Sequence, residues 1–81
     1  MNRTDRLRVD ALNATGTAAA ELRAAETNLD DAVARALHWD ASWTQIGDAL
    51  GVTRQSAHRR YRQLNWDPTT QTSWTEPPLP L

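Results

Sequence analysis

The sequence predicts an all-α protein, with a long N-terminal helix over residues 4–38, two short helices within residues 42–64 and an extended or disordered tail over residues 67–81. Three observations support this fold: an apolar stripe with helical spacing, a glycine between two capped segments, and a proline-rich end without periodicity. The length of 81 residues indicates one helical domain, residues 1–66, followed by the tail.

The long helix is predicted from apolar residues that recur every three or four positions. Thr4 is a suitable N-cap, and Asp5 favours the positive end of the helix dipole. Gly16 lies among weak helix formers, but the spacing continues through it. One continuous or mildly kinked helix is therefore favoured over two helices broken near residue 16. The stripe comprises Leu7, Ala11, Ala14, Ala18, Leu22, Ala25, Leu29, Val33 and Ala36.

This stripe is longer than the rest of the chain can cover, because 81 residues bury only a thin core. We therefore expect a homodimer that forms through the N-terminal helix. The alternative is that the N-terminal third of the helix is frayed and loosely ordered.

The first short helix is predicted over Trp43–Leu50. Residues 38–41 interrupt the helical pattern, and Ser42 follows as an N-cap with Gln45 three residues later, which matches a capping box. Gly51 comes directly after the last periodic residue, where a left-handed backbone favours glycine.

The second short helix is predicted from Arg54 to about Leu64, with Thr53 as its N-cap. The tail that follows contains all four prolines of the chain, and it shows no periodicity. Trp74 in this tail either docks on the body of the protein or on a partner, or stays exposed.

The net charge of −1 hides an uneven distribution of charged residues. Residues 10–48 carry seven acidic and two basic residues, whereas residues 49–66 carry four arginines and no acid. Exposed structural helices usually alternate both signs of charge. The clustered arginines therefore indicate a basic surface suited to nucleic acid.

Residues 43–61, WTQIGDALGVTRQSAHRRY, resemble the helix-turn-helix DNA-binding modules of bacterial repressors and the fourth-region module of sigma factors. The resemblance is closest to small actinobacterial, phage or plasmid proteins. It implies a core in which small and apolar residues fix the angle between the two short helices, while the hydroxyl of Tyr61 stays at the surface. We expect this core to contain Trp39, Trp43, Ile46, Gly47, Leu50, Val52, Ala57 and the ring of Tyr61.

The resemblance also implies that the second short helix enters the major groove. Arginine pairs with guanine and glutamine with adenine, so the residues expected to face bases are Thr53, Arg54, Gln55, Ser56, His58 and Arg59. The residues expected to contact phosphates are Thr44, Gln45, Arg60 and Arg62.

The predicted function is sequence-specific binding of double-stranded DNA by a homodimeric transcriptional regulator such as a repressor. One alternative is a plasmid or phage protein that binds a replication or partition site. Another is a protein-interaction module that acts through the long helix or through the PxxP spacing of Pro77 and Pro80.

An enzyme is not expected, because no nucleophile–base pair or phosphate-binding glycine loop is recognisable. The chain has no cysteine and two histidines, so we expect no metal and no cofactor. No apolar run approaches the ~20 residues that span a bilayer, and no secretory signal is recognisable, so we expect a cytoplasmic protein without membrane contact.

Overall fold

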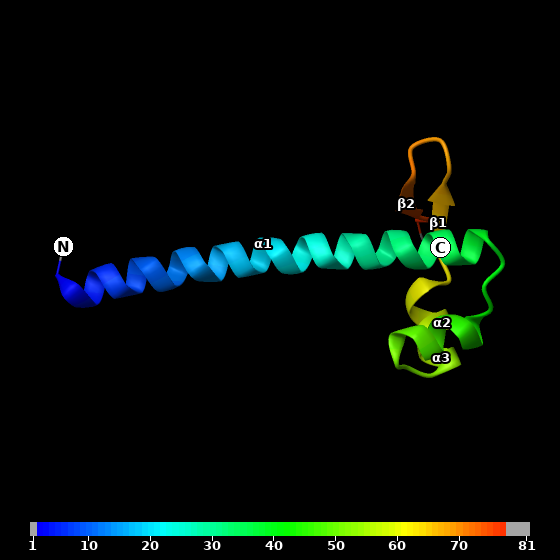
Figure 1. The fold of residues 1–81 in the computed structure, drawn as a ribbon, viewed down its shortest axis with the longest axis horizontal. Helices are drawn as coiled ribbons and strands as arrows, with labels where there is room; N and C mark the ends of the chain where they lie inside the picture. The colour runs from blue at the N-terminus through cyan, green and yellow to red at the C-terminus, as the bar shows by residue number, and fades with distance from the viewer. Residues whose placement is uncertain (1, 78–81) are drawn as a thin grey trace.

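The computed structural model describes residues 2–77, which form three helices and one antiparallel hairpin (Figure 1). The longest helix extends far beyond the other elements, which gather at its C-terminal end, with the two short helices on one side and the hairpin on the other (Figure 1). The elements are α1 (Arg3–His38), α2 (Trp43–Leu50), α3 (Arg54–Tyr61), β1 (Leu64–Asp67) and β2 (Thr72–Thr75).

The prediction of one continuous long helix is confirmed, because α1 runs through Gly16 without a break. The helix begins at Arg3 rather than Thr4, since the side chain of Asn2 is the N-cap and accepts a hydrogen bond from the Asp5 amide at 2.7 Å. A Cβ on Gly16 would meet no atom within 4 Å, so no packing contact requires glycine there.

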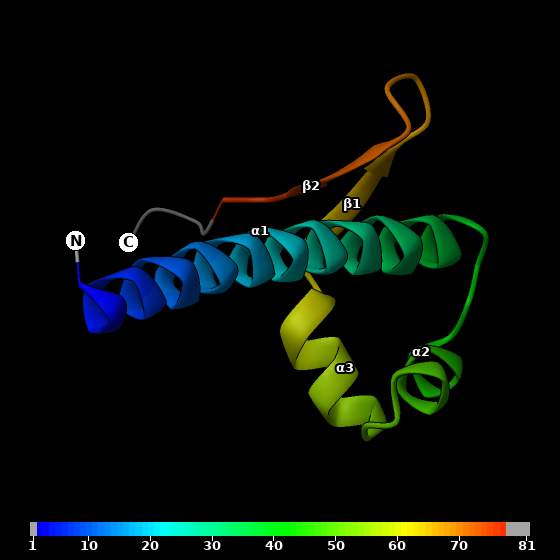
Figure 2. The ribbon, with the colours of Figure 1, turned by 60° about the vertical axis from the view of Figure 1, so that its left-hand side comes forward.

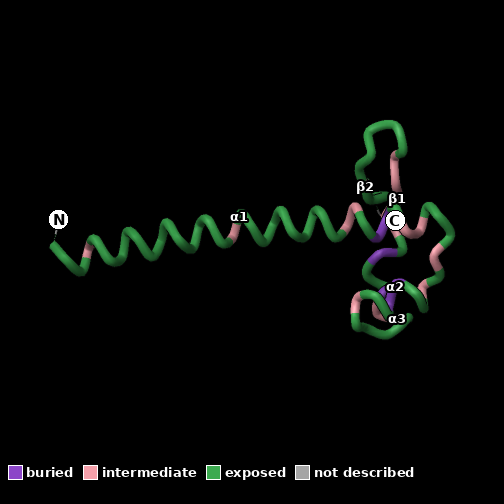
Figure 3. Tube along the Cα trace, viewed as in Figure 1, coloured by how far each residue is buried: buried purple, intermediate pink, exposed green. Residues whose placement is uncertain are grey.

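The first two thirds of α1 lie in solvent, and no residue from Arg3 to Leu29 is buried (Figure 3). Leu7 is 56% exposed and Leu22 is 60% exposed, although both belong to the apolar stripe. Within residues 2–77, none of the helices combines the length and the apolar character needed to cross a membrane. The stripe is therefore an apolar face that the described chain leaves uncovered.

The connection from α1 to α2 is a tight left-handed turn. The Ala41 amide donates to the Ala36 carbonyl at 3.0 Å, and the Asp40 amide donates to the Leu37 carbonyl at 3.1 Å. Asp40 takes the left-handed conformation, with φ 69°, at the position where glycine is commonest. This turn reverses the chain and starts α2 beside the C-terminal end of α1.

The predicted start and end of α2 are confirmed. The Gln45 amide donates to Ser42 Oγ at 3.1 Å, and the Ser42 amide donates to Gln45 Oε1 at 2.9 Å, which completes the capping box. Gly51 ends the helix with φ 74°, and Thr53 caps α3 as expected. The glycine is needed here because a side chain is strained at this φ.

The prediction of a purely α-helical chain is wrong. The second short helix ends at Tyr61, not near Leu64, and residues 64–75 form a two-stranded antiparallel sheet. Leu64 pairs with Thr75, and Asp67 pairs with Thr72. The predicted extended or disordered tail over residues 67–81 is therefore wrong for the part that forms the hairpin. Residues 78–81, which include Pro80 of the PxxP spacing, lie outside the described residues.

The hairpin turn is built by Asp67 and the residues that follow Pro68. The Thr69 amide donates to Asp67 Oδ1 at 2.9 Å, and the Gln71 amide donates to the Asp67 carbonyl at 2.8 Å. Gln71 takes the left-handed conformation, with φ 56°. An Asp-Pro pair is a recognised start of a turn, so this local signal was present in the sequence.

The core is small and lies where α1 meets α2 and α3 (Figure 3). Trp43 packs against it as expected, but two other predicted core residues do not: Trp39 is 76% exposed and Val52 is 45% exposed. The predicted position of the Tyr61 hydroxyl at the surface is also wrong, because that oxygen is buried. The buried residues of the cluster are Val33, Ile46, Ala57 and Tyr61.

The hairpin is fixed to α1 by Asp31. Its Oδ1 accepts hydrogen bonds from the Ser73 amide at 2.9 Å and from Ser73 Oγ at 2.6 Å. The hydrogen bond from the Ser73 side chain, followed by that from the Ser73 amide, lowers the pKa of Asp31, and the charge of Arg35 adds to this effect. The carboxylate thus joins two segments that are 42 residues apart.

We expect the hairpin to loosen in acid, and the substitution Asp31→Asn to remove this pH dependence. Because the pKa of Asp31 is lower in the folded chain, its contribution to stability is complete above the unfolded value of about 3.9. That contribution is lost as the pH falls through the lower folded value. The NMR shift of the Ser73 amide measures the effect.

The matched control for this titration is Asp30→Asn, because adjacent residues of a helix face different directions. We expect the Ser73 amide of this variant to titrate like that of the unmodified chain. If the NMR shift of the Ser73 amide changes with pH in the Asp31→Asn chain as it does in the unmodified chain, the role of Asp31 is contradicted.

Candidate nucleic-acid interface

A close backbone contact at Gly47 fixes how α2 meets the turn before α3. A Cβ on Gly47 would lie 2.9 Å from the carbonyl oxygen of Val52 and 3.2 Å from the amide nitrogen of Arg54. Both neighbours are backbone atoms, so the predicted need for a small residue is confirmed. Figure 2 shows the result, in which α3 extends away from α1 with α2 beside it.

α3 has a buried side and an exposed side. Ala57 and Tyr61 are buried at 1% and 3% exposure, and they hold α3 on the core. The predicted base and phosphate contacts on this helix and in the residue after it are mostly on the exposed side. The exposed side chains are Arg54, Gln55, His58, Arg59, Arg60 and Arg62.

Two predicted base-reading residues serve the cap of α3. The Ser56 amide donates to Thr53 Oγ1 at 3.1 Å, and Thr53 Oγ1 donates to Ser56 Oγ at 2.9 Å. Thr53 remains exposed, whereas Ser56 is half-buried. Their hydroxyl groups therefore stabilise the start of the helix, and the capping interaction explains why these residue types stand there.

The start of α2 lies close to the start of α3. Trp43 lines a shallow hollow together with Arg54, Gln55 and His58, and its ring meets the His58 ring edge to face with centroids 5.1 Å apart. Trp43 thus orients His58, which sequence reasoning did not detect. The predicted phosphate contacts Thr44 and Gln45 follow Trp43 in the first turn of α2, and both are exposed.

The arginines are less isolated from acids than the sequence indicated. Arg59, Arg60 and Arg62 line a second hollow together with Glu26 and Asp30 of α1. Sequence reasoning missed these carboxylates because they lie about 30 residues earlier in the chain. The basic surface of α3 is therefore bounded by negative charge on the side that faces α1.

Arg60 is positioned by its neighbour. Its guanidinium carbon lies 5.0 Å from the centre of the Tyr61 ring. Burial raises the pKa of Tyr61, the charge of Arg60 opposes this shift, and that of Asp30 adds to it. Arg60 therefore lies partly over the core and faces α1, in contrast to Gln55 on the outer side of α3.

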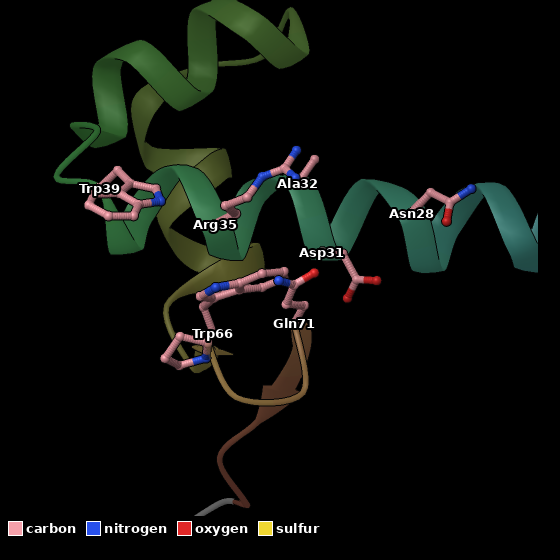
Figure 4. A pocket seen from close by; sticks show the side chains of 8 residues that line it. Asn28, Asp31, Ala32, Arg35, Trp39, Trp66 and Gln71 are labelled. Atoms are coloured by element: carbon pink, nitrogen blue, oxygen red, sulfur yellow. The ribbon is translucent and has the colours of Figure 1, made fainter.

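A third hollow lies across α1 from α3, between α1 and the hairpin (Figure 4). Figure 4 shows the indole of Trp66 and the side chain of Gln71, both from the hairpin, beside the face of α1 that carries Asp31. Arg35 and the exposed ring of Trp39 also line it. Sequence reasoning missed this hollow because it exists only when the hairpin is docked. In this hollow, Oδ1 of the Asp31 carboxylate already accepts hydrogen bonds from Ser73.

The resemblance of residues 43–61 to helix-turn-helix modules depends on their own sequence and geometry. The geometry that agrees with it consists of two capped helices, a left-handed Gly51 between them and the close contact at Gly47. Comparison with protein-family models, curated proteins and solved structures finds no match to this chain.

Proposed function

We propose that the protein binds double-stranded DNA in a sequence-specific manner, with α2 and α3 as a helix-turn-helix and with a role in transcriptional regulation. The observation that carries this proposal is the exposed side of α3, which together with Arg62 directly after it presents four arginines, a glutamine and a histidine, with α2 and the start of α3 held together by the Gly47 contact. Binding to a plasmid or phage replication or partition site uses the same interface, and only the target sequence distinguishes the two roles.

The position of each side chain on α3 suggests its role. Arg54 and Gln55 lie at the N-terminal end of the helix, which is the end that reaches base edges in such modules. Arginine makes bidentate hydrogen bonds to guanine, and glutamine makes them to adenine. His58 and Arg59 lie one turn further along, while Arg60 and Arg62 are assigned to phosphates.

A homodimer that forms through α1 completes the proposal. Its support is the uncovered apolar stripe, because an exposed apolar face of this length favours association. Two copies of α3 would then read two half-sites, and the symmetry of the target would reflect the symmetry of the protein.

Alanine substitutions on α3 are expected to divide into two groups. Arg54→Ala and Gln55→Ala lose discrimination at one base position, by about 5- to 150-fold, because a bidentate pair contributes ~1–3 kcal/mol. Arg60→Ala and Arg62→Ala weaken binding to all sequences alike and reduce the salt dependence of the affinity. Selection from a random DNA pool at moderate salt, followed by affinity measurements against salt concentration, tests both effects.

Arg35→Ala is the matched control, because it removes one positive charge from the side of α1 opposite α3. We expect its base preference to be unchanged. The absence of any enriched sequence from the pool, or four α3 variants that behave alike, would contradict the proposed interface.

A further inference from the structure

The uncovered stripe of α1 continues into an apolar hollow. The stripe residues from Leu7 to Leu29 are all exposed. At Leu29 the stripe enters a hollow between α1 and α2 that is lined by leucine, valine, isoleucine and alanine residues. It is formed by Leu29, Val33 and Ala36 of α1 and by Ile46, Ala49 and Leu50 of α2, among others. One apolar surface therefore runs from the N-terminal end of α1 to the core.

The steps between successive stripe residues follow the same order whether they are counted from the N-terminal or from the C-terminal end. From Leu7 to Leu29 the steps are four, three, four, four, three and four residues, with Ala18 at the centre. Eleven residues make three turns, so the stripe stays on one side of a nearly straight helix. A second helix that runs in the opposite direction, centred on Ala18, places each Leu7 against Leu29 of the other copy. The small alanine lies at the crossing point, where close approach is needed.

The charges beside the stripe decide between an antiparallel and a parallel pair. At about 100° per residue, Arg8 and Glu26 lie along one edge of the stripe, with Asp30 about 40° further round the helix, and Arg3, Asp10 and Glu21 lie along the other edge. In an antiparallel pair the same edges meet, and Arg8 falls between Glu26 and Asp30 of the second copy, two acids that also line a hollow with Arg59, Arg60 and Arg62 of their own chain. In a parallel pair opposite edges meet with an offset of five residues. That places Arg8 beside Arg3 and Glu26 beside Glu21, so like charges meet at both ends.

We infer that the stripe and the hollow bind a second copy of this chain, with the two α1 helices antiparallel and crossing at Ala18. The region around Leu7 in each copy lies at the mouth of the hollow formed by α1 and α2 of the other copy. This inference deepens the proposed dimer and rests on it, but it does not depend on DNA binding. It assigns a direction, a register and a set of contacts to the interface.

The arrangement sets the distance between the two copies of α3. α3 and the residue after it meet α1 between Glu26 and Val33, which are 8 and 15 residues from Ala18. At ~1.5 Å per residue, the two meeting points are about 24–45 Å apart along the helix axis. Both copies of α3 also lie beside the same edge of the dimer, since the hollow they share with α1 contains Glu26 and Asp30. This range includes the ~34–36 Å of one DNA turn.

Engineered cysteines test the direction, because the chain has no cysteine of its own. We expect a mixture of Leu7→Cys and Leu29→Cys chains to form a mixed disulfide rapidly under mild oxidation, without DNA present. Either variant alone is expected to remain largely reduced. Leu12→Cys is the matched control, because Leu12 is 63% exposed and lies about 100° around the helix from the stripe. Its rate of oxidation with Leu29→Cys gives the rate of random collision.

Rapid self-linking of Leu7→Cys would show a parallel pair and overturn the inference. A mixed-disulfide rate no higher than the Leu12→Cys rate would overturn it as well. Since no DNA is present, these results are independent of whether the alanine variants of α3 lose DNA binding. Failure of this inference is thus distinguishable from failure of the proposed function.

A charge reversal tests the same interface without cysteines. Arg8→Glu places a third acid between Glu26 and Asp30 of the other copy, and we expect it to raise the dissociation constant of the dimer about tenfold, because the contact occurs twice. Arg6→Glu makes the same change of charge about 120° from the centre of the stripe, on the flank opposite to Arg8, Glu26 and Asp30, and is expected to have little effect. Sedimentation equilibrium measures both. Equal effects of the two substitutions, or a monomer in the unmodified chain, would overturn the inference.

Discussion

Gly47→Ala is expected to destabilise the α2–α3 unit by about 3 kcal/mol and to abolish the proposed DNA binding. The added methyl group would lie 2.9 Å from the Val52 carbonyl oxygen and 3.2 Å from the Arg54 amide nitrogen. Backbone atoms cannot rotate away as a flexible side chain can, so α2 must separate from the turn. The change displaces the start of α3 as well, because Arg54 is its first residue. Thermal unfolding followed by circular dichroism measures the loss of stability.

Gly16→Ala is the matched control for this substitution. Apart from the adjacent backbone of α1 and its two chain neighbours, no atom lies within 4 Å of the position where its Cβ would stand. Alanine in an exposed helix interior is more favourable than glycine by ~0.5–1 kcal/mol, so this variant is expected to be slightly more stable. A Gly47→Ala chain as stable as the unmodified protein would refute the contact.

Tyr61→Ala is expected to destabilise the fold by about 3–5 kcal/mol, because it removes the largest member of a small buried cluster. Its ring is 3% exposed and contacts a core that otherwise consists of Val33, Ile46 and Ala57. Urea denaturation at fixed protein concentration measures the effect. The fold has little other buried apolar surface with which to compensate.

Tyr61→Phe separates the ring from its hydroxyl group. Within residues 2–77 the buried hydroxyl has no hydrogen-bond partner, so its removal is expected to be neutral or to stabilise by up to ~1 kcal/mol. Burial also raises the pKa of Tyr61 in the folded chain. The unmodified protein therefore loses stability as the pH rises above about 10 and through the higher folded value, whereas the phenylalanine variant does not. A phenylalanine variant destabilised like the alanine variant would contradict this account.

The parts of the fold that sequence analysis predicted correctly are determined within a few neighbouring residues. The capping box of Ser42 and Gln45 and the left-handed Gly51 each depend on contacts over three to five positions. The long helix follows from a period that repeats along its whole length. Local interactions of this kind are visible in the sequence because their partners are adjacent in it.

The parts that it missed depend on contacts between distant residues. The hairpin is stabilised by the pairing of Asp31 with Ser73, and a short hairpin without such a contact is only marginally stable. Composition alone therefore favoured an extended or disordered tail. Trp39 and Val52 were assigned to the core from their residue types, but the turn geometry on either side of α2 leaves them exposed.

The sequence predicted which residues of α3 are exposed in the candidate site, but it did not predict which residues of other elements lie next to them. The exposed side of α3 follows from helical spacing around Ala57 and Tyr61. The edge contact between His58 and Trp43 and the carboxylates of Glu26 and Asp30 come from other elements. No spacing within residues 49–66 contains that information.

The length of α1 gives the protein unusual hydrodynamic properties. The radius of gyration is 18.2 Å, whereas a compact chain of this length would have about 12 Å. By the same relation, 18.2 Å is typical of a compact protein of roughly 260 residues. Gel filtration separates molecules by hydrodynamic size and not by mass, so a single copy would elute earlier than a compact protein of 9.1 kDa. An early elution volume is therefore expected even from a monomer, and only a direct measurement of mass counts the subunits.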